Sequence, residues 1–348
     1  MHHLCSGWPA RFLSLLALTA AACTGLVEGP RLEVEAPPDG GTQTSAQPPA
    51  PAGCTALLGP VTALSAGVYC VTGDVIIPTG ITLDIPAGTT FIFKGRFHFG
   101  RDPALPDLDP PAVSGSGTLR AIGTADQPII FRGETADTRW YGLTISHAHA
   151  PVQLEYVTIS DTYKDETPPG MRILRRGGAL NSYMNEQGTI LRHCTFTNNR
   201  ALTVAGAVDI IGHGQWPHQG LVEITDSLFE NNSCECAQYD PSSANLCGGG
   251  ALRLTLISGD GELVKLQGNV FKGNAAHVTA GIEAYGGAVS GAHSEFVLGP
   301  GNVFELNTAD TGDGAISCNH EPRFGSVIDG VDVTTTFTRN TPDNGCGR

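Results

Sequence analysis

The sequence predicts an all-β protein, a right-handed single-stranded parallel β-helix (solenoid) of about seven to nine rungs. Three observations predict this fold. The motif Phe-x-x-Asn occurs five times, with its phenylalanines 33, 42, 33 and 33 residues apart. A doublet of small residues, followed by an aliphatic residue, alternates with that motif, and the intervening segments hold short strand-like runs without helical periodicity. One repeat cannot bury a hydrophobic face alone, whereas stacked copies can bury a continuous one.

Each end of the Phe-x-x-Asn motif has an expected place in such a stack. The aromatic residues should form an interior column, and they are Phe196, Phe229, Phe271, Phe304 and Phe337. The amide residues follow where the chain turns, and they are Asn199, Asn232, Asn274, Asn307 and Asn340. Stacked Asn amides hydrogen-bond from one strand layer to the next in cross-β assemblies, so we expect a structural Asn ladder.

The small-residue doublet predicts a tight corner. Glycine permits φ > 0 and leaves room where a Cβ would meet the neighbouring rung. The doublets precede Leu180, Val208, Leu252, Val289 and Ile316, which should point inward. By alternation the next residue of each copy should lie outside, and these residues are Asn181, Asp209, Arg253, Ser290 and Ser317.

The repeat defines one folded domain over residues 54–348, because looser strand-like runs continue it upstream in 73–93 and 117–160. Residues 1–22 have the charge and apolar pattern of a signal peptide, and their apolar stretch is too short to span a bilayer. Residues 23–53 are rich in Pro, Gly, Ser and Thr, which predicts a flexible tether.

The end of the signal segment, Ala20-Ala21-Ala22-Cys23, resembles the bacterial lipobox. In that motif the peptide is cut before the Cys, and the Cys then carries the lipid. The resemblance implies an N-terminal lipid anchor on Cys23 that attaches the protein to a membrane. Thr24 in place of Asp implies sorting to the outer membrane, with the domain facing the periplasm or the cell surface. The alternative is an ordinary signal peptide cut at Ala-x-Ala.

Acidic composition argues against a nucleic-acid partner. The chain has a formal net charge of -14, and only 16% of its residues are charged. Nucleic-acid binding needs a basic patch that displaces counterions from phosphate. We therefore expect no nucleic-acid partner, and no docking on anionic lipid by charge.

Cysteine content predicts disulfides. Eight of the ten cysteines lie beyond residue 23, an even number that permits disulfides in an exported protein. The sequence does not determine their connectivity. Cys54–Cys70 and Cys318–Cys346, near the two ends of the folded part, are the favoured pairs.

Alternating Phe-x-x-Asn and Gly-Gly-Ala-aliphatic motifs resemble the repeats of polymorphic outer-membrane proteins and related bacterial β-helix adhesins. The resemblance covers residues 156–340 and implies a β-helix with a surface role. Those autotransported proteins end in a membrane β-barrel, whereas this chain ends in TPDNGCGR. Lipid on Cys23 is therefore expected to replace the barrel as the anchor.

Two places could bind a glycan or a partner protein. Asn181, Asp209 and Arg253 would form an outward polar strip able to hydrogen-bond sugar hydroxyls, with Asp209 and Arg253 close enough to pair. The alternative is a solvated face with a weak surface ion pair. Loops held by a rigid scaffold are the second place.

The first of these loops, residues 162–176, supplies Arg172, Arg175 and Arg176 in an otherwise acidic protein. The second, residues 233–250, carries Cys234, Cys236 and Cys247. In an exported protein a disulfide within this second loop is favoured over a zinc site.

These observations predict a lipid-anchored cell-envelope protein with a binding, adhesion or structural role and no catalysis. The alternative is an extracellular polysaccharide lyase or glycoside hydrolase acting on an outward strand face. Gly212-His213-Gly214 matches a polygalacturonase-like triplet, but the Asp-Asp pair of that family occurs nowhere in the chain. No cofactor is expected, and Ca²⁺ on the acids of residues 100–111 is a minor alternative.

Overall fold

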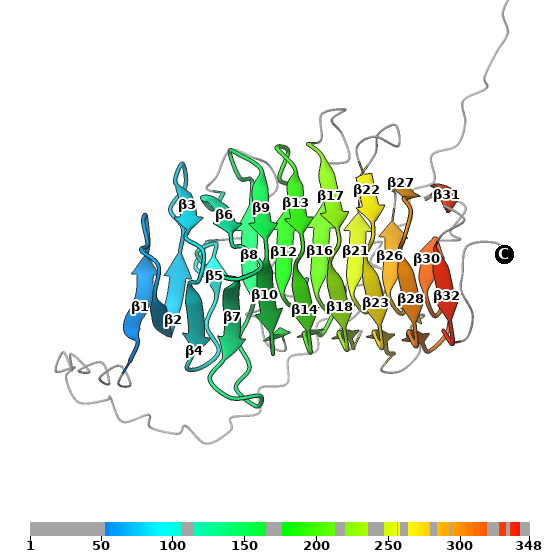
Figure 1. The fold of residues 1–348 in the computed structure, drawn as a ribbon, viewed down its shortest axis with the longest axis horizontal. Helices are drawn as coiled ribbons and strands as arrows, with labels where there is room; N and C mark the ends of the chain where they lie inside the picture. The colour runs from blue at the N-terminus through cyan, green and yellow to red at the C-terminus, as the bar shows by residue number, and fades with distance from the viewer. Residues whose placement is uncertain are drawn as a thin grey trace, which may run out of the picture. The chain divides into compact units, whose positions relative to one another are not determined.

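The described parts of the chain, in a computed structural model, belong to the unit Pro48–Arg348. Within them the secondary structure is entirely β, without a helix, which confirms the predicted class. Parallel strands stack along the unit from β1 to β32 in order of sequence (Figure 1). The described residues are 53–105, 115–164, 176–212, 220–235, 247–255, 257, 264–278, 284–292, 294–318, 327–331 and 335–341.

The largest sheet has 17 strands. It contains two runs of parallel strands, because β2 pairs with both β4 and β5. The first run, with the edge strand, is β1 (Thr55–Pro60), β2 (Val68–Ile76), β4 (Thr90–Phe93), β7 (Ile129–Gly133), β10 (Val157–Ser160), β14 (Thr195–Thr197), β18 (Leu228–Glu230), β23 (Val270–Lys272), β28 (Val303–Glu305) and β32 (Thr336–Thr338). The second is β5 (Phe99–Gly100), β8 (Leu143–Ser146), β12 (Leu180–Tyr183), β16 (Val208–Ile211), β21 (Leu252–Thr255), β26 (Val289–Ala292) and β30 (Ile316–Cys318).

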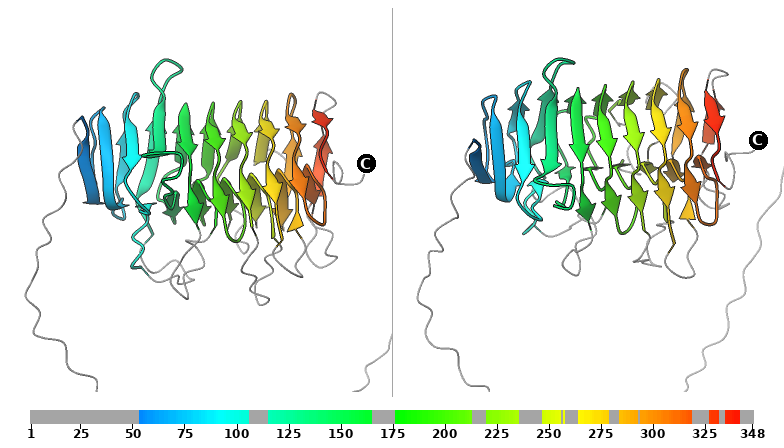
Figure 2. Two further views of the ribbon diagram at one scale, coloured as in Figure 1. Left: turned by 90° about the horizontal axis from the view of Figure 1, so that it is seen from below. Right: turned by 60° about the horizontal axis from the view of Figure 1, so that its bottom comes forward.

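Three smaller parallel sheets complete the described part. An eight-stranded sheet holds β3 (Thr82–Ile85), β6 (Thr118–Ile122), β9 (Val152–Glu155), β13 (Thr189–Arg192), β17 (Val222–Thr225), β22 (Val264–Gln267), β27 (Glu295–Leu298) and β31 (Val327–Val331). A five-stranded sheet holds β11 (Tyr163–Lys164), β15 (Arg200–Ala201), β19 (Ser233–Cys234), β24 (Ala275–Ala276) and β29 (Thr308–Ala309). The last pair is β20 (Cys247–Gly248) and β25 (Ala284–Tyr285). Figure 2 shows how regularly the strands repeat along the unit, an arrangement compatible with a parallel β-helix.

Aromatic rings run through the core as a continuous column. The rings of Phe196, Phe229, Phe271 and Phe304 are fully buried and stack at centroid distances of 4.9, 4.8 and 4.8 Å. Phe337 extends the column at 5.1 Å. The spacing matches that of paired strands, because each Phe is in register with the Phe of the next strand.

The amides that follow these phenylalanines form a ladder. Asn199 Nδ2 donates to Asn232 Oδ1, and Asn232 Nδ2 donates in turn to Asn274 Oδ1, each at 3.0 Å. The same bond joins Asn274 to Asn307 at 2.9 Å and Asn307 to Asn340 at 3.0 Å. Each Nδ2 also donates to a backbone carbonyl of the preceding strand layer, such as Phe229 O for Asn274. The ladder therefore satisfies buried backbone groups at every turn.

A second ladder, which the sequence analysis did not single out, lies at the turn before the aromatic strands. Asn269 Nδ2 donates to Asn302 Oδ1 at 3.2 Å, and both side chains are fully buried. Ser227 takes the equivalent place one layer earlier and accepts from Cys194 N. Its sequence signal is the tetrapeptide Gly-Asn-Val-Phe, which occurs at 268–271 and again at 301–304.

The two positions of the Gly doublet have different tasks. The first has a positive φ, +57° at Gly177, +72° at Gly249 and +64° at Gly286. The second approaches neighbouring backbone so closely that no Cβ fits, as at Gly206, whose Cβ would overlap Gly250 O and Ser233 N. Ser233 directly follows the ladder residue Asn232. The two sequence motifs therefore alternate because they meet in space.

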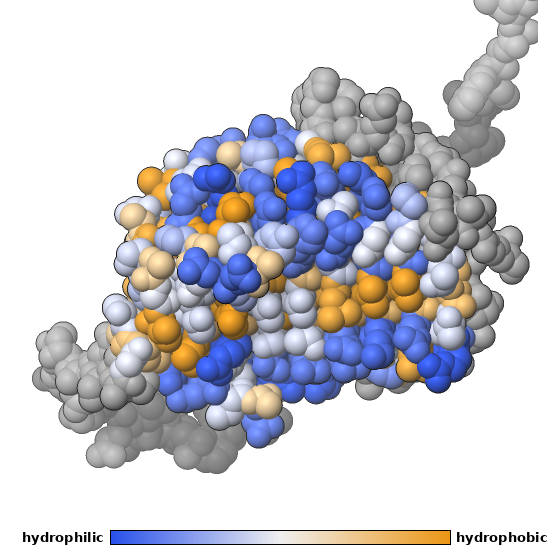
Figure 3. Space-filling view, in the orientation of Figure 1, coloured by the Kyte–Doolittle hydropathy of each residue, from blue (hydrophilic) through white to orange (hydrophobic). Residues whose placement is uncertain are grey.

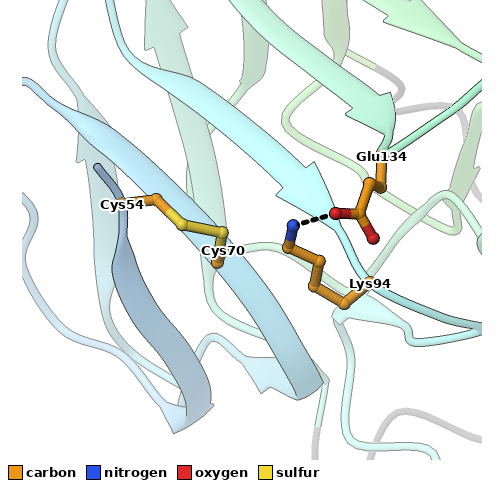
Figure 4. The surroundings of a disulfide bond; sticks show 4 residues. All are labelled: Cys54, Cys70, Lys94 and Glu134. Carbon is orange, nitrogen blue, oxygen red and sulfur yellow. Dashed lines mark hydrogen bonds and ion pairs between the residues drawn. A yellow bond between two sulfur atoms is a disulfide. The ribbon is translucent and has the colours of Figure 1, made fainter. Parts of the chain in front are cut away.

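The predicted pair Cys54–Cys70 is confirmed as a disulfide that ties β1 to β2 (Figure 4). Nearby, an ion pair between Lys94 and Glu134 joins later strands of the same sheet. The side chain of Cys318 and the whole of Cys346 lie outside the described residues, so their pairing stays a prediction.

Removing the Cys54–Cys70 disulfide should lower the free energy of unfolding by about 3 kcal/mol, because the bond closes a short loop and restricts the unfolded chain. The two cysteines are 16 residues apart in sequence. We expect a lower urea midpoint for Cys54→Ser than for the wild type under oxidising conditions. A reductant at a concentration that reduces this bond should lower the wild-type midpoint by more than it lowers that of the variant. Equal midpoints without reductant would contradict the prediction.

Candidate functional site

The polar residues that follow the small-residue doublets form one column across β12, β16, β21, β26 and β30, and Thr144 of β8 extends it. Strand register aligns them one per strand, in the order Thr144, Asn181, Asp209, Arg253, Ser290 and Ser317. The sequence analysis expected the last five on the outside, but all are buried, and Asn181, Asp209 and Arg253 have no exposed surface. That expectation was wrong.

The five-stranded sheet accounts for this burial. Its strands contribute a buried residue each, namely Lys164, Ala201, Cys234, Ala276 and Ala309. Lys164 Nζ donates to Thr144 Oγ1 of the column at 3.2 Å, and Cys234 interacts electrostatically with Arg253. Alternation along a strand fixes the side toward which a residue points, but it does not show whether another layer covers that side.

Asp209 forms an ion pair with Arg176 within the column. Arg176 Nε lies 2.5 Å from Asp209 Oδ2, with side chains 12% and 0% exposed. The other carboxylate oxygen, Oδ1, has no hydrogen-bond partner in the described part of the chain. The expected partner of Asp209 was Arg253, which is in register with it but donates from Nε to Thr255 Oγ1 at 3.1 Å.

Burial perturbs the basic groups of this cluster. Desolvation, followed by the neighbouring charge of Arg176, lowers the pKa of Arg253 to about 10, while Asp209 opposes the shift. Lys164 is 1% exposed, and desolvation lowers its pKa to about 7, again against the opposing effect of Asp209. Its Nζ also donates to the backbone oxygen of Arg176 at 2.9 Å. The cluster therefore ties β11 and Arg176 to the strand face beneath them.

His98 lies beside this cluster. The sequence analysis predicted neither His98 nor Lys164 as a site residue. The ring of His98 stacks on Tyr141 with a centroid distance of 4.6 Å, and its Nδ1 is buried without a hydrogen-bond partner among the described residues. Burial, followed by repulsion from Lys164, lowers the pKa of His98 to about 3. Neither Lys164 nor His98 belongs to a repeated motif, so no sequence pattern indicated them.

The structure describes only some of the other predicted site residues. Cys23, Arg172, Arg175, His213 and Cys236 lie outside the described residues. Cys234 is a buried thiol whose pKa desolvation raises to about 12, so the expected loop disulfide does not include it. Asp102, in the segment considered for Ca²⁺, accepts from the backbone N–H of Ala104 at 2.8 Å. Among the described residues, no group of three His, Cys, Asp or Glu side chains could hold a metal.

Replacing Lys164 with methionine should change how stability depends on pH. In the wild type the pKa of Lys164 is about 7 when folded, against an ordinary 10.5, so the unfolded chain binds more protons between these values. Wild-type stability should therefore rise with pH across this interval, and the destabilisation by Lys164 should be complete below pH 7. Lys164→Met removes this contribution, which is on the order of a few kcal/mol.

Urea midpoints of both proteins, measured from pH 6 to pH 10, test this expectation. The midpoint of Lys164→Met relative to the wild type should be highest at the acidic end and fall toward pH 10. Lys272→Met is the matched control, because its ammonium is half-exposed and pairs with Glu230 at the surface. A constant difference between wild type and Lys164→Met would contradict the prediction.

Compared with known proteins, the chain matches no protein-family model, no curated protein and no solved structure. The resemblance to polymorphic outer-membrane proteins therefore rests on the repeated motifs alone. The described ranges contain no helix long and apolar enough to cross a membrane.

Proposed function

We propose that residues 54–348 form a right-handed parallel β-helix of about seven to nine rungs. In-register parallel pairing supports this fold, because each strand pairs with the strand of the same kind one repeat later, as β14 pairs with β18 and β18 with β23. The Phe column and both amide ladders follow the same order. On this proposal, residues 1–22 are a lipoprotein signal peptide and residues 23–53 are a tether.

The proposed function is that of an exported protein, anchored in the outer membrane by lipid on Cys23 and facing the periplasm or the cell surface. Its long lateral surface binds a glycan or a neighbouring cell-surface protein, or braces the envelope, without catalysing a reaction. The observation that carries this proposal is the continuous Asn ladder from Asn199 to Asn340, which fixes the outer faces at the regular spacing of the strands. A rigid surface of this kind suits binding.

Metabolic labelling with a fatty-acid analogue, followed by membrane fractionation, tests the anchor. The wild type should carry the label and sediment with membranes, whereas Cys23→Ser should lose both properties. Cys5→Ser is the matched control, because Cys5 lies in the same segment before the proposed cleavage point, and this variant should behave as the wild type. An unlabelled wild type, or a label that persists in Cys23→Ser, would refute the anchor.

A second candidate function is that of a polysaccharide lyase or hydrolase, and the Lys164 cluster favours it. A general base works best when its pKa is near the working pH, and the pKa of Lys164 is about 7. Lys164 and Arg253 are buried, so this function requires the five-stranded sheet to move and admit the substrate. Arg176 and Arg253 would then face the carboxylate of a uronic acid whose adjacent proton a base removes. Release of unsaturated sugars from acidic polysaccharides, lost in Lys164→Met and retained in Lys272→Met, would establish this function and overturn the non-catalytic proposal.

A further inference from the structure

An aromatic pair stands at the turn between two sheets. Tyr156 links β9 to β10, and His193 holds the equivalent place between β13 and β14. Their rings stack with centroids 4.6 Å apart and planes 16° apart. The side chain of His193 is exposed, and that of Tyr156 is half-buried. The pair therefore presents an aromatic surface to solvent.

Both aromatic residues occupy a backbone conformation that bulky side chains rarely adopt. Their φ angles are +49° and +51°. The same turn position holds Asp226 one layer later, and then Gly268 and Gly301. Glycine adopts this conformation without the penalty, which is roughly 1–2 kcal/mol for most other residues and smaller for Asn and Asp. Two aromatic residues at such positions are a reason to look for a function of their side chains.

A row of apolar side chains begins two residues beyond this turn. Leu228, Val270 and Val303 are in register on β18, β23 and β28 and remain partly exposed. Figure 3 shows this hydrophobic run over those strands, with hydrophilic side chains on either side. Thr195 and Thr158 continue the row toward the aromatic pair and add hydroxyl groups. Together these seven residues form a surface that we name the aromatic face: Tyr156, His193, Thr158, Thr195, Leu228, Val270 and Val303.

Three acidic residues around the aromatic face have basic partners. Arg192 donates to both carboxylate oxygens of Glu223, at 3.1 and 2.9 Å. This hydrogen bonding holds the pKa of Glu223 below its ordinary value. On the other border, Lys272 pairs with Glu230 at 3.4 Å, and Arg339 pairs with Glu305 at 2.6 Å. This pairing reduces the attraction of the face for a polyanion or a polycation, and its fixed polar groups can still hydrogen-bond hydroxyls.

We infer that the aromatic face binds a neutral oligosaccharide that lies along the stack of strands. The C–H faces of the sugar rings would pack on His193, Tyr156 and the aliphatic row, as amphipathic ligands pack on aromatic side chains. Sugar hydroxyls would meet Thr195, Thr158 and the paired charges beside them. A single row of three aliphatic residues is small for a stable protein interface, which usually buries about 800 Å² on each partner. The inference rests on the proposed binding role and names its ligand class.

Saturation-transfer NMR and titration of the full-length protein test this inference. The probes are neutral oligosaccharides derived from cellulose, chitin, starch and galactan, with oligogalacturonate as the acidic comparison. At least one neutral probe should bind. Tyr156→Gly and His193→Gly should each weaken its binding at least about tenfold. Both variants should fold, because glycine accepts the left-handed conformation at these turns.

Asn198→Gly is the matched control, because Asn198 is an exposed residue with φ +55° at the opposite turn of the same layer. It should bind the neutral probe as the wild type does. Binding that persists in both aromatic variants would overturn the site while leaving the proposed binding role intact. Absence of binding by every neutral probe, or binding of oligogalacturonate alone, would also overturn the inference. Neither result would alter the outcome of lipid labelling at Cys23, which tests the anchor separately.

Discussion

Replacing Asn274 with alanine should lower the free energy of unfolding by about 4 kcal/mol. Asn274 is fully buried, and its Oδ1 accepts from both the backbone N–H and the Nδ2 of Asn232 at 3.0 Å. Its Nδ2 donates to Phe229 O and to Asn307 Oδ1 at 2.9 Å. Alanine removes the Asn274 side of each of these hydrogen bonds. The remaining donors and acceptors stay buried without a partner, which costs more free energy than the hydrogen bonds contribute.

Urea unfolding of Asn274→Ala and Asn198→Gly measures this effect against a matched change. Asn198 is an Asn of the same repeat, but it is exposed. Because surface substitutions of this kind are usually worth no more than about 0.5 kcal/mol, Asn198→Gly should unfold close to the wild-type midpoint. If the two variants lose equal stability, the ladder does not hold the stack together as we describe.

The sequence predicted the ladder because its spacing repeats at regular intervals. Phe271 and Asn274 recur 33 residues later as Phe304 and Asn307. Equal intervals of this kind are typical of stacked repeats, which place equivalent residues side by side. The same signal was present for Asn269 and Asn302, which stand two residues before those phenylalanines. This pattern is weaker, because Asn recurs only twice and Ser227 and Cys194 take the equivalent places in the earlier layers.

The environment of the polar column could not be predicted in the same way. Period-two alternation correctly placed Asp209 on the side of β16 opposite the core residue Val208, but a short strand pair elsewhere in the repeat covers that side. β15 and β19 are two residues long, too short for a hydrophobic pattern to reveal. Lys164 comes from such a strand, and its place in the cluster follows from tertiary packing alone.

Replacing Gly206 with alanine should lower the free energy of unfolding by about 3 kcal/mol. A Cβ at this position would overlap Gly250 O in the next layer and the backbone of Ser233. These are backbone atoms held by parallel pairing, so they cannot move aside as a flexible side chain would. The φ of Gly206 lies outside the left-handed region, so the cost comes from the close approach and not from the torsion.

Gly67→Ala provides the control for this change. The φ of Gly67 also lies outside the left-handed region, but a Cβ there would meet only Tyr69 Cε2, at 3.9 Å. Gly67→Ala should keep or slightly raise stability, because alanine restricts the unfolded chain more than glycine does. The midpoint of thermal unfolding should therefore be several degrees lower for Gly206→Ala than for Gly67→Ala. Equal midpoints would mean that the small-residue doublet is not required where the two motifs meet.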